Sequence, residues 1–537
     1  MKQEWIAGLL LLFALLFATQ LVNDGRIDHE RPYRYLARDS FYSAQLIVDA
    51  LEQNGFHGRA PYTIDYVEDN YYARPPMLGV LGVILVTSTG VDAYDAGYHA
   101  IFFIGILMMA LLYVLLRDIS SKLAIAAMPF AFLIFTWPFH AFLTAGHWPS
   151  ALDIFFVFSA VLVYTRLQKP IHYAFFAILI AGGLLSHTRE MLGFIIFIFP
   201  LFLLHDVCMK ELSWRRVGML ALSLAGAVLL YAGFLPYFLS RLGNQKLAFG
   251  NFISPNFDTP LPHDIHWVMY GILLLGLACS GYWFYSKRAK KAIPLLFGLG
   301  FSLLVFSNAF TNISAKAAAQ ARFFLPLALA VFFGFAFFFW VPKRWIPLAM
   351  VVSLLAVFAL HNFTEPERGP VIDSHVWPML DWLAENIPEN ETVLSLYALE
   401  VGHDAPYWMT KRNVHILLPT MHVKNMETLE GASFRLNLHS RENYVVRDGI
   451  WGFEEIDPNV HVVGNDLCDY RYILLQKQFS KLRRQGHTDK AVQLLEAYVA
   501  SERRKLLEYK NMTILYADSW FEVLLNDGCS GEVYTIG

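Results

Sequence analysis

Long runs of apolar residues constrain the fold of this chain more than any other feature of its sequence. A helix that crosses a bilayer needs about 20 mostly apolar residues, and such runs recur along the first 361 positions. We predict spans near 4–22, 97–116, 122–139, 148–165, 171–187, 190–205, 217–239, 264–285, 292–310, 322–341 and 343–361. The sequence therefore predicts a mainly α-helical polytopic membrane protein with about eleven spans.

The composition agrees with a membrane protein. Of the 537 residues, 56% are hydrophobic and 16% are charged, against about 45–50% and about 25% in soluble domains. The net charge of -3 leaves no basic excess for phosphate neutralisation, which argues against a nucleic-acid partner. Glu4 weakens the start of the first apolar run as a signal peptide, and no small-residue cleavage site follows it. We interpret this run as a retained span.

Lysine and arginine predict the orientation, because they are enriched in cytoplasmic loops. With the N-terminus in the cytoplasm, the cytoplasmic loops contain Arg117, Lys122, Arg166, Lys169, Lys210, Arg215, Arg216, Lys287, Arg288, Lys290, Lys291, Lys343 and Arg344. The opposite short loops contain only Arg189, Arg241, Lys246, Lys316 and Arg322. The sequence thus predicts a multi-pass protein of the plasma (inner) membrane whose residues 365–537 are extracytoplasmic.

The loop at 23–96 is long and carries two expected surface helices. Phe41, Ala44, Val48 and Leu51 have helical spacing. The apolar segment 77–91 follows a Pro-Pro turn and is too short for a span. Counting it as a span would move every basic loop to the wrong side, so we expect it to lie along the outer membrane surface or to re-enter the membrane from that side.

Residues 365–537 differ in character from the membrane domain at 1–364. Strand-like runs at 392–396, 414–418, 472–476, 513–516 and 520–525 alternate with helical patterns at 376–385 and 488–508. These patterns predict a small soluble α/β domain. Cys468 and Cys529 both fall in it and are candidates for a disulfide, since the extracytoplasmic side permits one.

Ionisable residues near the outer ends of spans are the candidate site, because charge close to hydrocarbon is costly. They occur in five places: Arg38-Asp39-Ser40; Tyr71-Tyr72-Ala73-Arg74-Pro75-Pro76; His147 with Asp153; His187 with Arg189 and Glu190; and Lys316 with Arg322. Arg241 follows the seventh predicted span on the same side.

This layout resembles the GT-C superfamily of glycosyltransferases. The resemblance rests on one span, a long outer loop with an Asp opening a helix, the Tyr-x-Arg-Pro-Pro-Met turn ending at Met77, and the Ala-Arg-Phe-Phe-Leu-Pro-Leu run that contains Arg322. It is most similar to the protein O-mannosyltransferase and aminoarabinose-transferase branch, and more distantly to oligosaccharyltransferases. It implies a polyprenyl-phosphate-linked sugar as donor.

The resemblance also implies roles for individual residues. Asp39 matches the base that accepts a proton from the acceptor hydroxyl. Arg74 and Arg322 match basic residues at the lipid phosphate, and Arg241 is a further candidate for that task. Unlike many O-mannosyltransferases, this sequence has no acid beside Asp39, and Arg74 has no neighbouring Glu. No metal ligands are therefore assigned, and a divalent metal ion stays open as a cofactor.

Each candidate has a simpler structural reading. Asp39 can cap a helix, Arg74 and Arg322 can anchor the chain at the interface, and His147 can be a capping residue. Asp153 lies inside a span and needs a partner. The default for Arg189 and Glu190 is a local ion pair. As substrate-contact candidates we take Tyr72, Asp153, His147, Arg189 and Glu190.

The predicted function is transfer of a single hexosyl or pentosyl unit from a polyprenyl-phosphate donor to an acceptor hydroxyl, with inversion at C1. A carboxylate takes the proton while cations stabilise the leaving phosphate. The acceptor is a glycan, a lipid or a protein, and membrane lipid surrounds the chain. Two alternatives stay open: a transporter or flippase of lipid-linked glycans, and a non-catalytic surface-assembly protein of the same fold.

Overall fold

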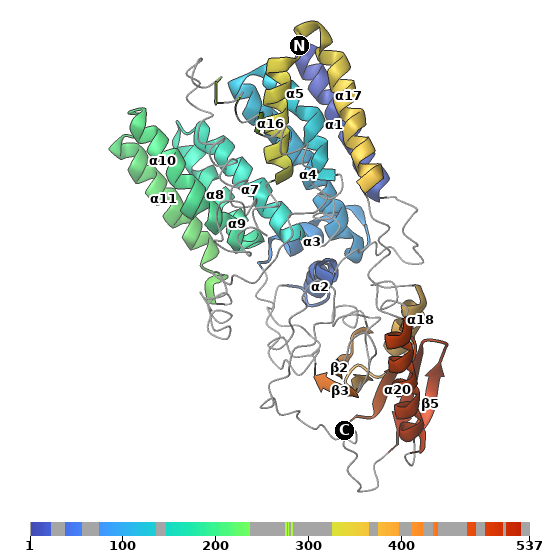
Figure 1. Cartoon of the computed structure of the whole chain (residues 1–537). Coiled ribbons are helices and arrows are strands. Elements are labelled where there is room, and N and C mark those ends of the chain that lie inside the picture. The colour runs from blue at the N-terminus through green and yellow to red at the C-terminus, as the bar shows by residue number, and fades with distance from the viewer. Residues whose placement is uncertain are drawn as a thin grey trace. The chain divides into compact units, whose positions relative to one another are not determined.

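The computed structural model describes most of the helical region and the core of the C-terminal region. The described residues are 2–22, 38–55, 75–135, 147–236, 274–275, 278, 281–282, 325–364, 374–396, 410–422, 433–438, 470–479, 489–508 and 512–527. They divide into two compact units (Figure 1), one holding the described residues up to 364 and the other those from 374 onward.

The first unit is helical. Its helices are α1 (Lys2–Val22), α2 (Arg38–Glu52), α3 (Met77–Thr89), α4 (Ala93–Ile119), α5 (Ser121–Ala131), α7 (Trp148–Thr165), α8 (Pro170–Ser186), α9 (Thr188–Gly193), α10 (Phe199–Cys208), α11 (Trp214–Tyr231), α16 (Leu325–Trp340) and α17 (Ile346–Thr364). A 3-10 turn, Phe132–Phe135, extends α5, and a π-helix, Phe194–Ile198, joins α9 to α10.

Within the described residues, four segments are long and apolar enough to cross a membrane. They are Ala93–Ile119, Trp148–Thr165, Glu190–Cys208 and Trp214–Tyr231. Shorter apolar helices include Pro170–Ser186, Pro326–Phe337 and Pro347–Val357. The predicted span near 292–310 lies outside the described residues, as does most of the one near 264–285, so the total of about eleven stays a prediction.

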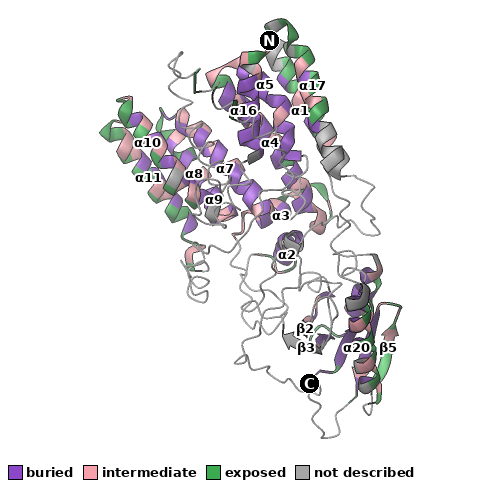
Figure 2. Ribbon diagram, in the orientation of Figure 1, coloured by how far each residue is buried: buried purple, intermediate pink, exposed green. Residues whose placement is uncertain are grey.

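The helices pack into two neighbouring groups, seen in Figure 1. In one, α5 packs against α4 and α16, and in the other, α8 packs between α7 and α11. Gly334 of α16 lets the backbones approach, since a Cβ there would lie 2.7 Å from the Ala127 Cβ. Close approach at small residues is typical of helices in membranes. Figure 2 shows exposed residues along α11 and α17, and Leu229 and Leu355 there are apolar, as a lipid-facing surface requires.

The two surface helices expected from the long loop are present. α2 contains the four residues of helical spacing and ends at Glu52, shortly before Asn54, which lies in the left-handed region (φ 52). α3 has 13 residues, too few to span a bilayer, and ends at Gly90 with φ 72. Both helices pack against α4. Ile47 of α2 fills the space left by Gly82, where a Cβ would lie 2.3 Å from the Ile47 Cδ1.

A buried ion pair links α7, α10 and α11. Asp206 accepts a hydrogen bond from the Tyr164 hydroxyl at 2.6 Å, and its Oδ2 lies 2.8 Å from an Arg216 nitrogen. Arg216 also lies over the Tyr164 ring, 5.2 Å from its centroid. The hydroxyl and the guanidinium group together compensate the charge of the buried carboxylate, and we assign this network a structural role.

The second unit is a six-stranded sheet of order β3-β2-β1-β4-β6-β5. The strands are β1 (Thr392–Leu396), β2 (Asn413–His422), β3 (Ser433–Leu438), β4 (Tyr472–Gln476), β5 (Met512–Ala517) and β6 (Phe521–Asn526), with helices α18 (Trp377–Asn386) and α20 (Asp489–Glu508). β1 pairs in parallel with β2 and β4, and the other pairs are antiparallel.

The sequence predictions for this unit are confirmed for five strands and two helices. β3 was not predicted, although Phe434, Leu436 and Leu438 alternate with polar residues as a half-buried strand does. Cys468 and Cys529 lie outside the described residues, so their disulfide stays a prediction.

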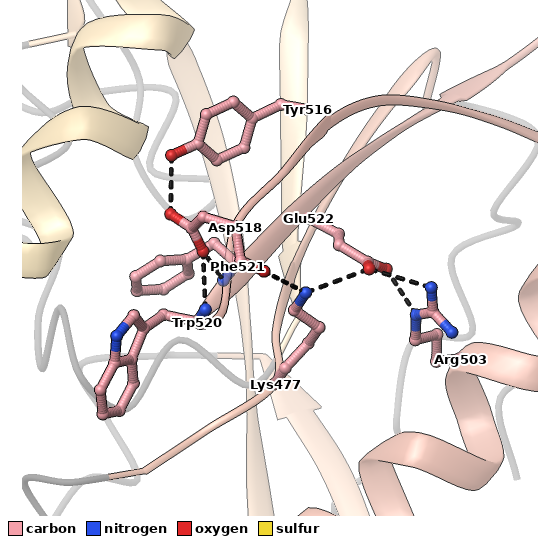
Figure 3. A network of polar contacts seen from close by, with 7 residues as sticks. All are labelled: Lys477, Arg503, Tyr516, Asp518, Trp520, Phe521 and Glu522. Atoms are coloured by element: carbon pink, nitrogen blue, oxygen red, sulfur yellow. Dashed lines mark hydrogen bonds and ion pairs between the residues drawn. The ribbon is translucent and has the colours of Figure 1, made fainter.

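A polar network fixes α20 to the sheet, as Figure 3 shows. Glu522 of β6 accepts hydrogen bonds from Arg503 at 2.6 and 2.9 Å and from Lys477 at 3.1 Å. Burial alone would raise the pKa of Glu522, but the bonds from Arg503 and Lys477 outweigh it and hold this pKa below its ordinary value. The hydrogen bonds that Arg503 donates to Glu522 raise the pKa of Arg503.

Candidate functional site

The predicted residues differ in how far the structure describes them. Asp39 is the second residue of α2, within its first turn, where a negative charge is favoured by the helix dipole. Tyr72, Arg74, Arg241 and Arg322 lie outside the described residues, and their roles stay predictions.

His147 precedes α7 at its N-cap position. Its side chain makes no capping hydrogen bond to that helix, whereas its carbonyl accepts from the Ala151 N–H at 3.1 Å. Trp148, the next residue, is fully buried and lies against Gly97 of α4, where a Cβ would come within 2.7 Å of the indole. The start of α7 is thereby fixed against α4.

Asp153 is fully buried in α7, at 0% exposure. Its Oδ2 accepts a hydrogen bond from the backbone N–H of Met191 at 2.9 Å. Its Oδ1 is buried and has no hydrogen-bond partner. The partner that an intramembrane aspartate requires is therefore supplied for one oxygen by the backbone of α9.

His187 and Glu190 form a contact across the turn between α8 and α9. His187 adopts an extended conformation (φ -155, ψ 103) that ends α8, and α9 begins at the next residue. This break directs the His187 Nδ1 toward the Glu190 Oε2, with which it is in contact. Glu190 is 4% exposed, and its Oε1 has no hydrogen-bond partner.

The predicted Arg189–Glu190 pair is not tested, because the Arg189 side chain lies outside the described part. The partner that the structure gives Glu190 is His187. The Ser150 hydroxyl lies 3.5 Å from the His187 Nδ1 and links this turn to the first turn of α7.

These contacts bring Asp153 together with His187 and Glu190, from two separate candidate places in the sequence. One ligand-type atom each from Asp153, His187 and Glu190 lies within 4.8 Å of the others. The helices α7, α8 and α9 pack against one another and lie side by side in Figure 1. Gly183 of α8 makes the approach achievable, since a Cβ there would lie 2.6 Å from the Asp153 Oδ1 and 2.0 Å from the Met191 Cε. The sequence marked these residues in two separate places but gave no signal that they meet.

The structure of this chain is similar to solved structures of proteins from Archaeoglobus fulgidus and Cupriavidus metallidurans. The apo oligosaccharyltransferase of Archaeoglobus fulgidus matches with a TM-score of 0.54 and 15% identity, over 76% of this chain and 64% of that one. The chain thus spans less than two thirds of that protein's length. AglB of the same organism, in complex with an inhibitory peptide and a dolichol-phosphate, matches with a TM-score of 0.53 and 15% identity. The match covers 77% of this chain and 65% of that one.

ArnT from Cupriavidus metallidurans, in its apo state, matches with a TM-score of 0.51 and 12% identity over 98% of both chains. At these identities the likeness shows the fold alone. No protein-family model and no curated protein matches the sequence.

Proposed function

We propose that this chain, which has the fold of the GT-C superfamily of membrane glycosyltransferases, transfers a single sugar from a polyprenyl-phosphate donor to an acceptor hydroxyl outside the cytoplasm. The observation that carries the proposal is the match with ArnT over 98% of both chains, so that the helical and the sheet-containing units both have counterparts. The dolichol-phosphate bound to AglB supports a lipid phosphate as part of the donor.

In the proposed reaction, the acceptor oxygen attacks C1 of the sugar while the bond from C1 to the phosphate oxygen breaks. Asp39 takes the proton of the hydroxyl. The electron pair of the broken bond leaves on the polyprenyl phosphate, whose charge Arg74, Arg322 and Arg241 stabilise. Attack from the face opposite the phosphate inverts C1.

The packing of the first unit supports this assignment. α2, whose first turn contains Asp39, packs against α3 and α4 and also contacts α7, which carries Asp153. The helix with the proposed base and the helix with the buried acid are therefore neighbours. Tyr72, His147, Arg189 and Glu190 complete the proposed substrate contacts.

The test uses the full chain in nanodiscs. Mass spectrometry of copurifying lipid first identifies the polyprenyl-phosphate species that it holds. The purified protein is then given that donor class and a panel of hydroxyl acceptors, and release of polyprenyl phosphate is measured together with sugar-modified acceptor. Equal amounts of both products would support transfer.

The alternatives give different results in the same preparation. A flippase would move intact donor between the leaflets of a proteoliposome without releasing polyprenyl phosphate. A non-catalytic assembly protein would do neither. Either result, with a correctly folded protein and the copurified donor, would refute the transferase proposal.

A further inference from the structure

Three side chains of ligand-forming types converge between α7 and the turn that joins α8 to α9. They are Asp153, His187 and Glu190. Among the residues that the structure describes, no other group of three such side chains comes as close together. Carboxylate oxygens and an imidazole nitrogen are the ligands that zinc and related divalent transition metals take in proteins.

Two oxygens of this cluster lack partners. Asp153 Oδ1 and Glu190 Oε1 are both buried without a hydrogen bond, and their residues are 0% and 4% exposed. Burying an acceptor without a partner costs about 1–3 kcal/mol, and more if it is charged. The unpartnered oxygens belong to the residues that already face one another, so one bound species can satisfy both.

Charge gives a second reason for a bound species. Two carboxylates this close in a buried place cannot both stay ionised without compensation. At Asp206, elsewhere in the same unit, the compensating positive charge comes from Arg216, which lies 2.8 Å from the carboxylate. At Asp153 the described partner is a backbone N–H, which carries no full charge.

We propose that Asp153, His187 and Glu190 bind a divalent transition-metal ion that ties the α8–α9 turn to α7. His187 would contribute Nδ1, the nitrogen that already faces Glu190. Asp153 would contribute Oδ1, since its Oδ2 is taken by Met191. Glu190 completes a set of one nitrogen and two oxygens, and water or substrate oxygen fills the remaining positions.

The geometry needs only a small adjustment. Ligand atoms about 2.1 Å from one ion lie roughly 3–4 Å from each other, and one ligand-type atom from each of the three residues lies within 4.8 Å of the other two. Rotation of the three side chains would bring the ligand atoms to this spacing. The Asp153 Oδ1 and the Met191 Cε occupy the place that a Cβ of Gly183 would take, 2.6 and 2.0 Å from it.

This inference goes beyond the proposed transfer reaction, because metal binding is measured without donor or acceptor. A protein that transfers no sugar can still bind the ion, and a transferase can lack it. The two proposals therefore fail independently.

The experiment uses tag-free full-length protein in nanodiscs. The protein is stripped with a chelator and titrated with Zn²⁺ and, separately, Mn²⁺ by calorimetry, and bound metal is counted by mass spectrometry after dialysis. We expect about one ion per chain and a higher Tm with metal than after chelation, since a ligand that binds only the folded state stabilises it.

Matched variants locate the site. Asp153→Asn and Glu190→Gln keep the shape of each side chain but remove its charge, and His187→Gln removes the imidazole. Each is expected to lower the metal affinity at least about tenfold, the scale on which even supporting residues act. Asp118→Asn, which alters an exposed pair with Arg166, is expected to leave the affinity unchanged.

Two outcomes would overturn the proposal. One is wild-type protein, folded by its thermal transition, that binds neither ion at millimolar concentration. The other is wild-type affinity in Asp153→Asn and Glu190→Gln. Because the chelation arm uses wild-type protein, the proposal is testable even if a variant does not fold.

Discussion

The Asp153 carboxylate accepts a hydrogen bond from the Met191 backbone N–H at 2.9 Å, across 38 positions of sequence. This bond joins the N-terminal third of α7 to α9, the short helix that follows α8. The same carboxyl group lies close to Glu190 and His187. The charged end of the α7, α8 and α9 group is therefore an assembled cluster rather than three separate polar residues.

The proposed base is tested by Asp39→Asn. Asparagine keeps the size of the side chain and tolerates a helix start, but it cannot take the acceptor proton. We expect turnover to fall about 100-fold or more, with donor binding largely kept. Polyprenyl phosphate release measures turnover, and thermal unfolding controls for the fold. Near wild-type turnover would leave Asp39 with a helix-start role only.

The proposed phosphate contacts are tested by Arg74→Ala and Arg322→Ala. A lipid phosphate is charged both before and during transfer, so donor affinity and turnover should both decrease. A charge-assisted hydrogen bond contributes about 1.5–3 kcal/mol, which corresponds to roughly 10- to 100-fold weaker donor binding. Arg166→Ala, at an exposed ion pair, is the matched control and should bind donor normally.

Gly183→Ala tests the close approach of α7, α8 and α9. The new Cβ would meet the Asp153 Oδ1 at 2.6 Å and the Met191 Cε at 2.0 Å. Overpacking of this kind costs about 1–3 kcal/mol, so the Tm and the metal affinity should decrease together. Gly218→Ala on α11 meets nothing within 4 Å and should lower neither. A Gly183→Ala protein with unchanged Tm would show that these helices are not held as closely as described.

The Glu522 network predicts how the C-terminal unit responds to acid. The pKa of Glu522 is lower in the folded state than in the unfolded state, because Arg503 and Lys477 outweigh the effect of burial. Its contribution to stability is therefore present above the unfolded pKa, about 4.3, and is lost as the pH falls below it toward the folded pKa.

Hydrogen exchange of β6 and α20 in the full-length protein measures this response. After correction for intrinsic exchange, wild-type protection should fall over that acidic range, and Glu522→Gln should start lower at neutral pH and change less. Glu508→Gln, at an exposed position, should behave as wild type. Identical pH profiles for wild type and Glu522→Gln would contradict the assignment.

The orientation is tested by single cysteines in a background without the natural four. Cysteines placed beside Lys287 and Lys343 should react with an impermeant reagent only after the membrane is permeabilised, since basic loops are cytoplasmic. Cysteines in residues 365–537 should react in intact cells. Reaction of that region only from the cytoplasmic side would reverse the predicted topology.

The sequence predicted the elements better than their contacts. The apolar runs near 148–165 and 171–187 coincide with α7 and α8 to within a residue, because Pro149 and Pro170 lie in the first turn of each helix. The strand at 472–476 was also predicted with its observed bounds, since five buried residues stand between polar segments. Local composition alone determines such boundaries.

The cluster could not be predicted in the same way. Asp153 and His187 are separated by a loop and most of two helices, and their meeting depends on how α7 packs against α8. That packing depends on the absence of a side chain at Gly183. A single glycine in an apolar helix does not indicate which helix approaches it. Ionisable residues next to apolar runs identified the candidates in the sequence, and only the structure shows that they lie close together.

The π-helix Phe194–Ile198 has a consequence for insertions and deletions. A π segment accommodates an extra residue within an α-helix. Upstream of it, Glu190 faces Asp153 and His187, and downstream, Phe199 and Phe202 pack on Tyr164 at ring distances of 5.5 and 5.4 Å. Removing one residue would restore a regular helix and rotate one part by about 100° relative to the other. The extra residue thus changes the direction of the side chains about the helix axis. One continuous helical segment can therefore contribute Glu190 to the polar cluster at one end and Phe199 and Phe202 to an aromatic core at the other.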